Sequence, residues 1–533
     1  MSKSADKIRA QVAKRVAEES AMAPVKPEEK PAPLPVDFLT SCLLANRVGD
    51  ATLYAALHRG KFVYVERWGT WYRWAGHYWK HDIKNSRSLA AIERVCEEYQ
   101  RIITEGGFDE DKPTYKLIRR RLDILRDKSG RENLLECAAT IDDPLSIDGQ
   151  EFDQQNYLLA CPNGVIDLRT GQLSPGQPEQ YISKSCPTEF RGLDEPSPTF
   201  DAFLLSCFDG DAEMVTYILR LLGYGLLGTR YDHIWAIFHG PRGRNGKDTL
   251  MNICFDVLGD ELVTIITTAT LLQQSFQRSG GQPDPDILNL RGAKLAFANE
   301  TESNQKIAMS RIKELTGGSK LTARGVNEKY FTKWNQSHLL FLMTNALPKI
   351  DSDDDAFWSR LRAIHWPLRF VPKNEIKAAD ERERDPKMGE KLRIETSGIL
   401  ARLVQGAMDY LANGENPPEK VLAYTREQRE MFDDIGNFLN DCCVRESAPA
   451  LSGKWQTRIE ASTFVAICNW WLKQTFGNAY PYSAKRITQA LDKKGIRSQK
   501  SNKMHYLGVS IKNDVLFEYN AATGNPEEKS WPK

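Results

Sequence analysis

The sequence predicts an α/β protein with a central parallel sheet, flanked by a mixed α+β N-terminal domain and a basic C-terminal domain. Three apolar runs of strand length predict the sheet, at residues 234–238, 295–298 and 339–344. Uninterrupted apolar runs of this length are typical of parallel strands buried on both faces. Apolar residues at helical spacing follow the first run, from Leu250 to Leu258, as expected where helices cover such a sheet.

The composition is that of a globular protein of several domains. The 533 residues suffice for two to four domains, and the chain is 41% hydrophobic and 27% charged. No apolar run is long enough to cross a bilayer, and the charged N-terminus lacks the apolar core of a signal peptide. The ten cysteines are scattered without a Cys-x-x-Cys pair. We therefore expect a cytoplasmic protein with core thiols and no membrane partner.

Composition and pattern divide the chain into five segments. The first is rich in Ala, Lys, Glu and Pro, which predicts a solvated tether without a core. The last contains a basic block, with eight Lys or Arg and one acid between Lys485 and Lys512. The predicted bounds are 1–36 for the tether, 37–195 for the N-terminal domain, 196–375 for the central core, 376–455 for a helical region and 456–533 for the C-terminal domain.

A glycine-rich loop joins the first apolar run to the helix behind it. Residues 239–249 read His-Gly-Pro-Arg-Gly-Arg-Asn-Gly-Lys-Asp-Thr. This arrangement cradles phosphates, because glycines let backbone N–H groups converge and a helix N-terminus attracts negative charge. The lysine then reaches the β- and γ-phosphates. The alternative is a glycine-rich turn without a nucleotide. The predicted ATP-binding residues are Gly240, Gly243, Asn245, Gly246, Lys247, Asp248 and Thr249.

The loop departs from the common pattern in length and in its metal ligand. Counted from Gly240, it is one residue longer than Gly-x4-Gly-Lys, and Asp248 replaces the usual Ser or Thr after the lysine. Either Asp248 or Thr249 must therefore hold the magnesium, directly or through water. The predicted cofactors are ATP and Mg²⁺.

Polar residues end the other two apolar runs. Glu300 follows the second run, where P-loop enzymes place the acid that activates the attacking water and supports magnesium. Asn345 ends the third run, where a neutral amide can touch both the γ-phosphate and the water. We predict Glu300 as the general base and a metal residue, and Asn345 as a catalytic residue beside Lys247. The alternatives are a surface glutamate and an ordinary strand-end asparagine.

A basic segment follows a helix that stops at Gly317 and Gly318. Residues 322–335 have the pattern of a hairpin, with Lys329 near its tip. The alternative is a solvent-exposed turn.

The order of these motifs resembles that of the superfamily 3 helicases, in the phage and plasmid primase-helicase branch that includes the poxvirus primase-helicase. The resemblance is strong over residues 201–366 and weaker before and after, where 163–171 look like the family's N-terminal module. Ser319 departs from the acid that family members usually have there. The motifs are the Asn-Gly-Lys of the loop, the strand-ending Glu300, Leu-Thr-Gly-Gly at 315–318, Thr-Asn at 344–345 and Phe-Trp-Ser-Arg-Leu-Arg at 357–362.

The resemblance implies an AAA+-type P-loop ATPase core in a homohexameric ring, with DNA in the central channel and ATP at each subunit interface. By position, Arg360 looks like the arginine finger, a catalytic residue that enters the neighbour's site. Arg362 is the second choice, and a structural salt bridge is the alternative for either. Lys329, supported by Lys320 and Arg324, corresponds to the hairpin that grips the DNA backbone.

The C-terminal segment looks like a winged-helix DNA-binding domain. Residues 463–476 predict one helix, Ser483 predicts the N-cap of a second helix, and 497–511 predict a basic two-stranded wing. The alternative is a domain used only for contacts within the ring. The predicted DNA contacts here are Lys485, Arg486 and Arg497.

Together these features predict an ATP-hydrolysing DNA helicase that translocates on single-stranded DNA during phage, plasmid or mobile-element replication. The expected partners are single-stranded and forked DNA, the other ring subunits, and replication proteins such as a primase or polymerase. If the protein is phage-encoded, its compartment is the host cytoplasm. The alternative is an origin-binding initiator that uses ATP for assembly and local melting. A small-molecule P-loop kinase is disfavoured by Asn345, Arg360 and the basic tail.

Overall fold

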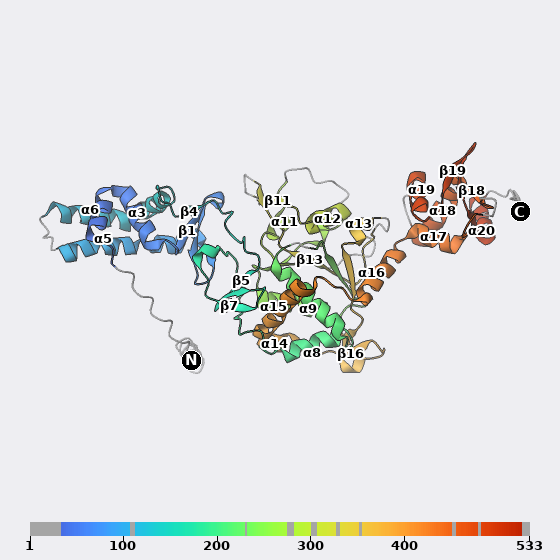
Figure 1. Cartoon of the computed structure of the whole chain (residues 1–533), viewed down its shortest axis with the longest axis horizontal. Helices are drawn as coiled ribbons and strands as arrows, with labels where there is room; N and C mark the ends of the chain where they lie inside the picture. The colour runs from blue at the N-terminus through green and yellow to red at the C-terminus, as the bar shows by residue number, and fades with distance from the viewer. Residues whose placement is uncertain are drawn as a thin grey trace, which may run out of the picture. The chain divides into compact units, whose positions relative to one another are not determined.

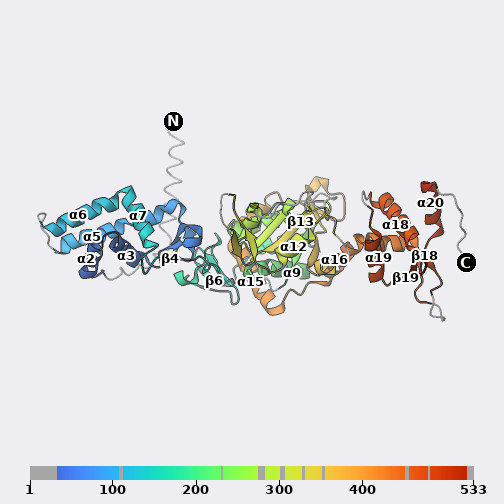
Figure 2. The ribbon, with the colours of Figure 1, turned by 90° about the horizontal axis from the view of Figure 1, so that it is seen from above.

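The computed structural model describes most of the chain in two compact units (Figure 1, Figure 2). The first unit falls within Met1–Arg73 and His81–Gly149, and the second within Trp74–Lys80 and Gln150–Lys533. None of the described helices combines the length and apolarity needed to cross a bilayer. The described residues are 33–106, 112–229, 232–273, 282–299, 306–326, 331–350, 354–449, 455–477 and 481–524.

Helices with one apolar face build the first unit. Apolar residues three or four positions apart in α5 and α6 are at most 2% exposed, as in Tyr99 and Leu122. In β1 and β2, which pair antiparallel, Phe62 lies beside Arg73. The elements between residues 36 and 147 are α2 (Val36–Leu44), α3 (Asn46–His58), β1 (Phe62–Val65), β2 (Thr70–Trp74), β3 (Trp79–His81), α4 (Ser86–Ala90), α5 (Glu93–Gly106), α6 (Pro113–Arg126), α7 (Lys128–Ala138) and β4 (Ser146–Ile147).

A five-stranded parallel sheet in the order β14-β8-β13-β10-β9 forms the centre of the second unit. The three apolar runs of the sequence form β8, β10 and β13, so the predicted mixed α/β fold with a parallel sheet is confirmed. In register, His239 lies beside Thr344, and Met343 lies beside Asn299. The strands therefore end together, and the loops behind them open at one edge. The strands are β8 (Trp235–His239), β9 (Val263–Ile265), β10 (Leu295–Asn299), β13 (Leu339–Thr344) and β14 (Leu361–His365).

Successive residues of these strands enter two separate cores, because side chains alternate across a sheet. Phe238 and Phe341 pack in the core shared with α9, α10 and α15. Ile237 and Leu342 pack in the core shared with α12 and α13. The helices accordingly cover both faces of the sheet (Figure 1). They are α9 (Ala212–Leu227), α10 (Lys247–Leu258), α12 (Met309–Thr316), α13 (Asp355–Trp358) and α15 (Thr396–Asn413).

Helices α9 and α15 pack with their backbones in contact. A Cβ added at Gly223 would lie 2.1 Å from the Ala407 nitrogen, and one added at Gly406 would lie 2.1 Å from the Leu219 carbonyl oxygen. Glycine is therefore required at both crossing positions. The other elements of this part are β5 (Leu158–Cys161), β6 (Gly164–Asp167), β7 (Gln172–Ser174), α8 (Pro198–Cys207), α11 (Pro285–Asn289), β11 (Leu321–Ala323), β12 (Thr332–Trp334), β15 (Arg369–Val371), β16 (Glu381–Glu383), α14 (Met388–Ile394) and α16 (Glu419–Met431).

The C-terminal residues form a small helical bundle with a three-stranded antiparallel sheet in the order β18-β20-β19. The Ser483 hydroxyl accepts the Arg486 N–H at 3.2 Å, which confirms the predicted helix cap. All ten cysteines are free thiols, and nine are buried. The elements are α17 (Asp434–Cys442), β17 (Cys443–Arg445), β18 (Arg458–Glu460), α18 (Ala461–Phe476), α19 (Ala484–Lys493), β19 (Ser498–Lys500), β20 (Met504–Leu507), β21 (Val509–Ile511) and α20 (Asn513–Thr523).

Candidate functional site

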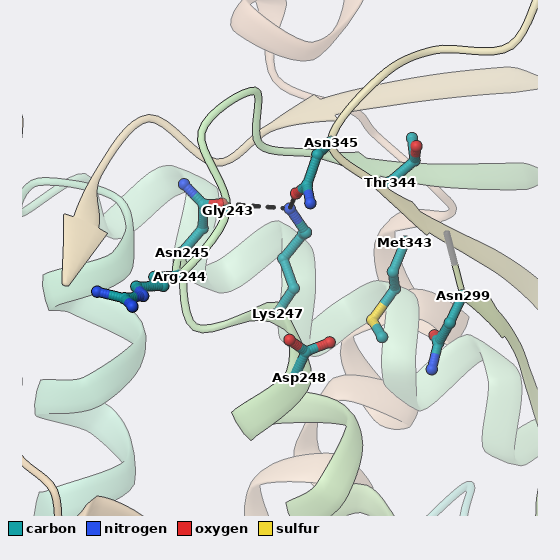
Figure 3. A pocket seen from close by; sticks show the side chains of 9 residues that line it. All are labelled: Gly243, Arg244, Asn245, Lys247, Asp248, Asn299, Met343, Thr344 and Asn345. Atoms are coloured by element: carbon teal, nitrogen blue, oxygen red, sulfur yellow. Dashed lines mark hydrogen bonds between the residues drawn. The ribbon is translucent and has the colours of Figure 1, made fainter. Parts of the chain in front are cut away.

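The glycine-rich loop places the Lys247 ammonium at the centre of the sheet edge (Figure 3). Its Nζ donates to the Asn345 Oδ1 at 3.1 Å, to the Asn245 Oδ1 at 3.3 Å and to the Gly240 carbonyl at 3.4 Å. The loop after β8 and the end of β13 therefore meet at one cation, as the sequence order of Lys247 and Asn345 led us to expect.

Lys247 is a buried cation with neutral partners. It is only 6% exposed, and burial lowers the pKa of its ammonium to about 8, although nearby Asp248 opposes this shift. His239, which ends β8, adds no charge at neutral pH because burial lowers its pKa to about 4. Among the described residues, Lys247 forms no ion pair. A buried charge without an opposite charge is unfavourable, so this site favours an anion.

Two glycines of the loop are required by close contacts. A Cβ at Gly240 would lie 2.4 Å from the Asn245 Oδ1 and 2.6 Å from the Lys247 Nζ. Gly246 has φ 91° and directly precedes α10, and a Cβ there would lie 2.7 Å from the Cys207 Sγ. Any side chain at these positions would displace the lysine or the loop.

Asn245 positions the loop from within. Its side chain is 4% exposed, and its Nδ2 donates to the carbonyls of Leu368 at 2.7 Å and Trp366 at 3.2 Å. The sequence motif included Asn245 among the ATP-binding residues, but only the structure reveals this anchor to the segment after β14. The two partners lie more than 120 residues further along the chain, beyond any local sequence signal.

Two neighbouring cavities open at the loop. A cavity of about 350 Å³ surrounds the Lys247 ammonium. A second cavity of about 950 Å³ shares Arg244 and Asp248 with it, and its wall includes the rings of Phe203 and Phe370. The smaller cavity is lined by Gly243, Arg244, Asn245, Lys247, Asp248, Asn299, Met343, Thr344 and Asn345 (Figure 3).

Two of the three metal candidates line these cavities. Asp248 is exposed and lines both cavities, whereas Thr249 is half-buried and lines the larger one. Glu300 lies outside the described residues, directly after Asn299. The buried Oδ1 of Asn299 has no hydrogen-bond partner among the described residues, so the wall contains an unsatisfied acceptor. The part of the chain that the structure describes contains no cluster of three His, Cys, Asp or Glu side chains suited to a metal.

Arg360 and Arg362 lie at the start of β14, at the opposite end of the sheet's strands from Lys247. In the parallel pair of β14 and β8, Leu361 lies beside Trp235 and His365 beside His239. Arg360 therefore precedes the strand whose far end neighbours the glycine loop. Five residues of strand span about 16 Å. A polar cavity of about 350 Å³ at this edge is lined by Asp232, His233, Ile234, Ala356, Ser359, Arg360, Arg362 and Glu415.

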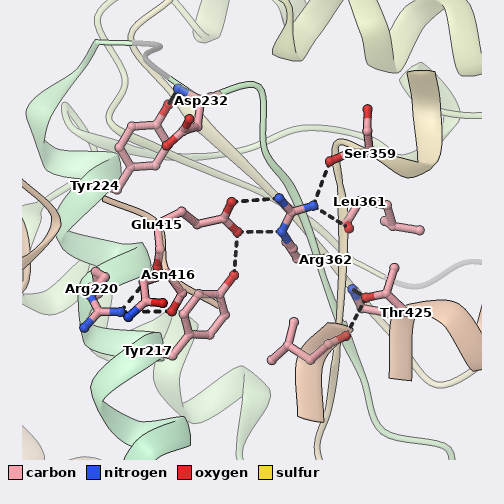
Figure 4. A network of polar contacts seen from close by, with 12 residues as sticks. Tyr217, Arg220, Tyr224, Asp232, Ser359, Leu361, Arg362, Glu415, Asn416 and Thr425 are labelled. Atoms are coloured by element: carbon pink, nitrogen blue, oxygen red, sulfur yellow. Dashed lines mark hydrogen bonds and ion pairs between the residues drawn. The ribbon is translucent and has the colours of Figure 1, made fainter. Parts of the chain in front are cut away.

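The two arginines differ in their contacts, and Figure 4 shows those of Arg362. Arg362 binds Glu415 in bidentate fashion, with Nε–Oε1 and Nη2–Oε2 distances of 2.6 and 2.7 Å. The Tyr217 hydroxyl also donates to Glu415, at 2.9 Å. Arg360 forms no ion pair among the described residues and donates from Nη1 to the Lys313 carbonyl at 3.0 Å. For either arginine, the alternative to the finger role is a structural salt bridge. In the structure, Arg362 forms one.

We expect Arg362→Met to lower the free energy of unfolding by about 3–5 kcal/mol, because it leaves the Glu415 carboxylate buried without its partner. The side chains of the pair are 16% and 12% exposed, respectively. Adding Glu415→Gln should recover most of the loss, since the amide still accepts from Tyr217. Urea unfolding of the three proteins measures this, and a single variant as stable as wild type would contradict it.

The predicted DNA contacts lie on two surfaces. On the β11–β12 hairpin, Lys320 is exposed and Arg324 lies over the Phe331 ring at 5.8 Å, whereas Lys329 is outside the described residues. The hairpin itself is as predicted, with Thr322 beside Lys333. The exposed Lys333 is a basic residue that sequence reasoning missed, although its place in the hairpin pattern was a usable signal.

On the C-terminal bundle, Lys485 and Arg497 are exposed. Arg486 is half-buried and stacks on the Tyr482 ring, with its guanidinium carbon 3.9 Å from the ring centroid. Two hydrogen bonds with the Asn469 amide fix the backbone of Tyr482. This surface therefore presents basic groups from a well-anchored helix start.

Comparisons with known proteins identify relatives of the chain. Residues 51–209 match the family described as "D5 N terminal like". The chain is 28% identical over 402 residues to "Putative helicase L207/L206" of Acanthamoeba polyphaga mimivirus, covering 71% of this chain and 41% of that protein. It is 26% identical over 246 residues to "Putative primase C962R" of African swine fever virus, covering 45% of this chain and 25% of that protein.

The chain thus spans less than half the length of these relatives. Among solved structures, it is similar to an apo form of the NrS-1 C-terminal region, with a TM-score of 0.41 and 10% identity, covering 87% of this chain and 100% of that one. The sequence matches confirm the resemblance that the motifs indicate: the chain contains a D5 N-terminal-like segment and is related to proteins of large DNA viruses named as helicase or primase, consistent with the primase-helicase branch of superfamily 3.

Proposed function

We propose that the protein is an ATP-dependent DNA helicase with an AAA+-type P-loop core, which assembles as a homohexameric ring and acts in phage, plasmid or mobile-element replication. The observation that carries the proposal is the buried Lys247 ammonium, which a glycine loop and the strand-end Asn345 hold and which forms no ion pair among the described residues. A triphosphate supplies the charge that this site lacks.

The two cavities suit the two parts of a nucleotide. The polar cavity around Lys247 takes the phosphates, and the larger, more apolar cavity takes the nucleoside. Asp248 or Thr249 would hold Mg²⁺ where the cavities meet, and Glu300 would support it. A bound magnesium ion would neutralise charge on the β- and γ-phosphates. In this proposal the Glu300 carboxylate accepts the proton of the attacking water, and the Asn345 amide orients that water beside the γ-phosphate.

The sheet register supports a role for Arg360 in a neighbouring subunit. Because it lies at the other end of β14 from the glycine loop, its backbone is about a strand length from the Lys247 site of its own chain. As an arginine finger it would therefore act on the ATP of the adjacent subunit and stabilise charge on the departing phosphoryl group.

The affinity for ATP should fall as the pH rises through about 8. The pKa of Lys247 is about 8 in the free protein, so the ammonium is charged below this pH and neutral above it. Phosphate stabilises the charged form and raises its pKa, so each pH unit above 8 should weaken binding by up to about tenfold. Calorimetric titration with Mg-ATP from pH 7.5 to 9.5 measures this. Lys247→Arg should lose the dependence, since a guanidinium does not titrate in this range, whereas a flat wild-type profile would contradict it.

Two basic surfaces support DNA as the partner. Lys320 and Arg324 of the hairpin, together with Lys329, which the sequence predicts near its tip, would contact the phosphates of single-stranded DNA in the ring channel. The helix and strand order from α17 to β20, with its β18-β20-β19 sheet, supports the proposal of a winged helix, in which α19 would carry Lys485 and Arg486 and the wing would begin after Arg497. Replication proteins such as a primase or polymerase are the proposed further partners.

A strand-displacement assay tests the proposal. With ATP and magnesium, the protein should unwind a forked duplex of arbitrary sequence, and it should require the single-stranded tail. The exposed basic surface of α19 favours a second candidate, an origin-binding initiator that uses ATP for assembly and local melting. That candidate gains support if melting occurs only at one duplex sequence. An assembled protein that neither binds nor hydrolyses ATP in the presence of DNA contradicts both.

A further inference from the structure

The C-terminal end of α12 forms hydrogen bonds both with Arg360 and with the root of the β11–β12 hairpin. Arg360 Nη1 donates to the Lys313 carbonyl at 3.0 Å and to the Thr316 hydroxyl at 3.3 Å. Thr316 is 3% exposed and ends α12. Carbonyls in the last turn of a helix lack partners within the helix. Arg360 therefore caps the Lys313 carbonyl, and it also donates to a hydroxyl that itself donates to the Ile312 carbonyl at 2.8 Å.

Gln336 holds the hairpin to the same helix end. Its Nε2 donates to the Glu314 carbonyl at 2.5 Å, and its Oε1 accepts the Gly318 N–H at 3.3 Å. Gly318 lies shortly before β11 and Gln336 shortly after β12, so one amide closes the root of the hairpin against α12. Gln336 is only 4% exposed, so water does not replace these bonds easily. The hairpin cannot tilt relative to α12 without breaking them.

Some hydrogen-bond donors of the Arg360 guanidinium have no acceptor among the described residues. Of its five N–H donors, those on Nη1 point to α12, while Nε and Nη2 have no acceptor among the described residues. The side chain is half-buried and lines the polar cavity at the edge of the sheet. One guanidinium can therefore contact an external anion and the end of α12 at once.

We propose that Gln336 and Thr316 are positioning residues that couple Arg360 to the β11–β12 hairpin. A phosphate bound by the outer donors of Arg360 fixes the guanidinium, and its Nη1 fixes the end of α12. Through its two hydrogen bonds, the Gln336 amide makes the root of the hairpin move together with the end of α12. Lys320 and Lys333 of the hairpin therefore move with it. Gain or loss of the phosphate at a subunit interface thereby moves the DNA-contacting strands. This inference rests on the proposed helicase function.

Gln336→Met tests the coupling, because it keeps the size of the side chain and removes both hydrogen bonds. We expect basal ATP hydrolysis close to that of wild type and a loss of about tenfold in the stimulation of hydrolysis by single-stranded DNA and in unwinding of a forked duplex. The matched control is Gln405→Met, which also removes two side-chain amide hydrogen bonds away from the hairpin, one donated to the Leu193 carbonyl (2.8 Å) and one accepted from Arg402 (3.2 Å). The control should keep stimulation and unwinding at the wild-type level.

The outcomes separate the coupling from the function. If wild-type hydrolysis responds to DNA and Gln336→Met responds equally, the coupling is overturned and the helicase proposal stands. If wild-type hydrolysis ignores DNA and no duplex is unwound, the helicase proposal falls and the coupling falls with it. Should Gln336→Met fail to fold, Thr316→Val decides in the same way, since it removes the hydroxyl at constant size. Thr316→Ser, which restores the hydroxyl, should then recover the response, and equal responses of both Thr316 variants would overturn the coupling.

Discussion

Lys247→Met should abolish ATP binding while leaving the free protein as stable as wild type or more stable. The ammonium is buried among neutral oxygens, so without ATP it bears a desolvation cost that nearby Asp248 offsets only in part. An apolar side chain of similar length removes that cost. In the presence of ATP, Lys247→Met should be less stable than wild type, because the phosphates have lost the cation that binds them. ATP hydrolysis by the variant should fall by at least about 10²- to 10³-fold.

Thermal unfolding with and without Mg-ATP measures both halves of this expectation. Wild type should gain in melting temperature on addition of ATP, by an amount that grows with ATP concentration, and Lys247→Met should not. Lys420→Met is the matched control, because Lys420 pairs with Asp211 on the surface of the same unit, far from any phosphate in the proposal. It should keep both the ATP shift and hydrolysis. An equal ATP shift in Lys247→Met would remove the lysine from the nucleotide site.

Arg360→Ala should bind ATP with normal affinity and hydrolyse it about 10³-fold more slowly. Its own loop, Lys247 and Asn345 are untouched, since the arginine lies at the other edge of the sheet. What is lost is the charge that each subunit supplies to its neighbour. Single-turnover hydrolysis at saturating ATP, with nucleotide binding measured separately, distinguishes this from a binding defect. A variant that hydrolyses ATP at the wild-type rate would rule out the arginine finger.

Mixing the two inactive variants should restore activity. In a ring that contains both, a Lys247→Met subunit offers an intact Arg360 to the intact loop of an Arg360→Ala neighbour. Hydrolysis should therefore rise above that of either variant alone and depend on the mixing ratio. If the mixture stays inactive although the rings form, Arg360 does not act across the interface.

The parallel sheet and the glycine loop were predictable because their signals are local. Uninterrupted apolar runs identified β8, β10 and β13, and glycine spacing placed the loop before α10. The roles of Asn245 and Arg362 were not predictable in this way. Asn245 binds carbonyls beyond β14, and Arg362 binds Glu415 in the loop between α15 and α16. Such pairings depend on which segments the fold brings together, and a single sequence does not encode them in any spacing.

The structure does not test the roles that were assigned from the order of motifs alone. Glu300 and Lys329 lie outside the described residues, and their roles stay predictions, as do the domain bounds drawn from composition. Gln336 was not singled out at all, because a glutamine between two strands carries no pattern. Its importance depends on being buried at the root of the hairpin, which only the three-dimensional contacts show.

The two cores, one on each face of the central sheet, determine how precisely the groups around Lys247 are positioned. Adjacent residues such as Phe341 and Leu342 differ in shape and belong to different cores. If β13 slipped by a single position, every side chain would be sent to the wrong face, so the packing forbids it. The same restraint keeps Asn345 level with the loop after β8. Interior side chains far from any phosphate therefore set the spacing of the groups that would bind it.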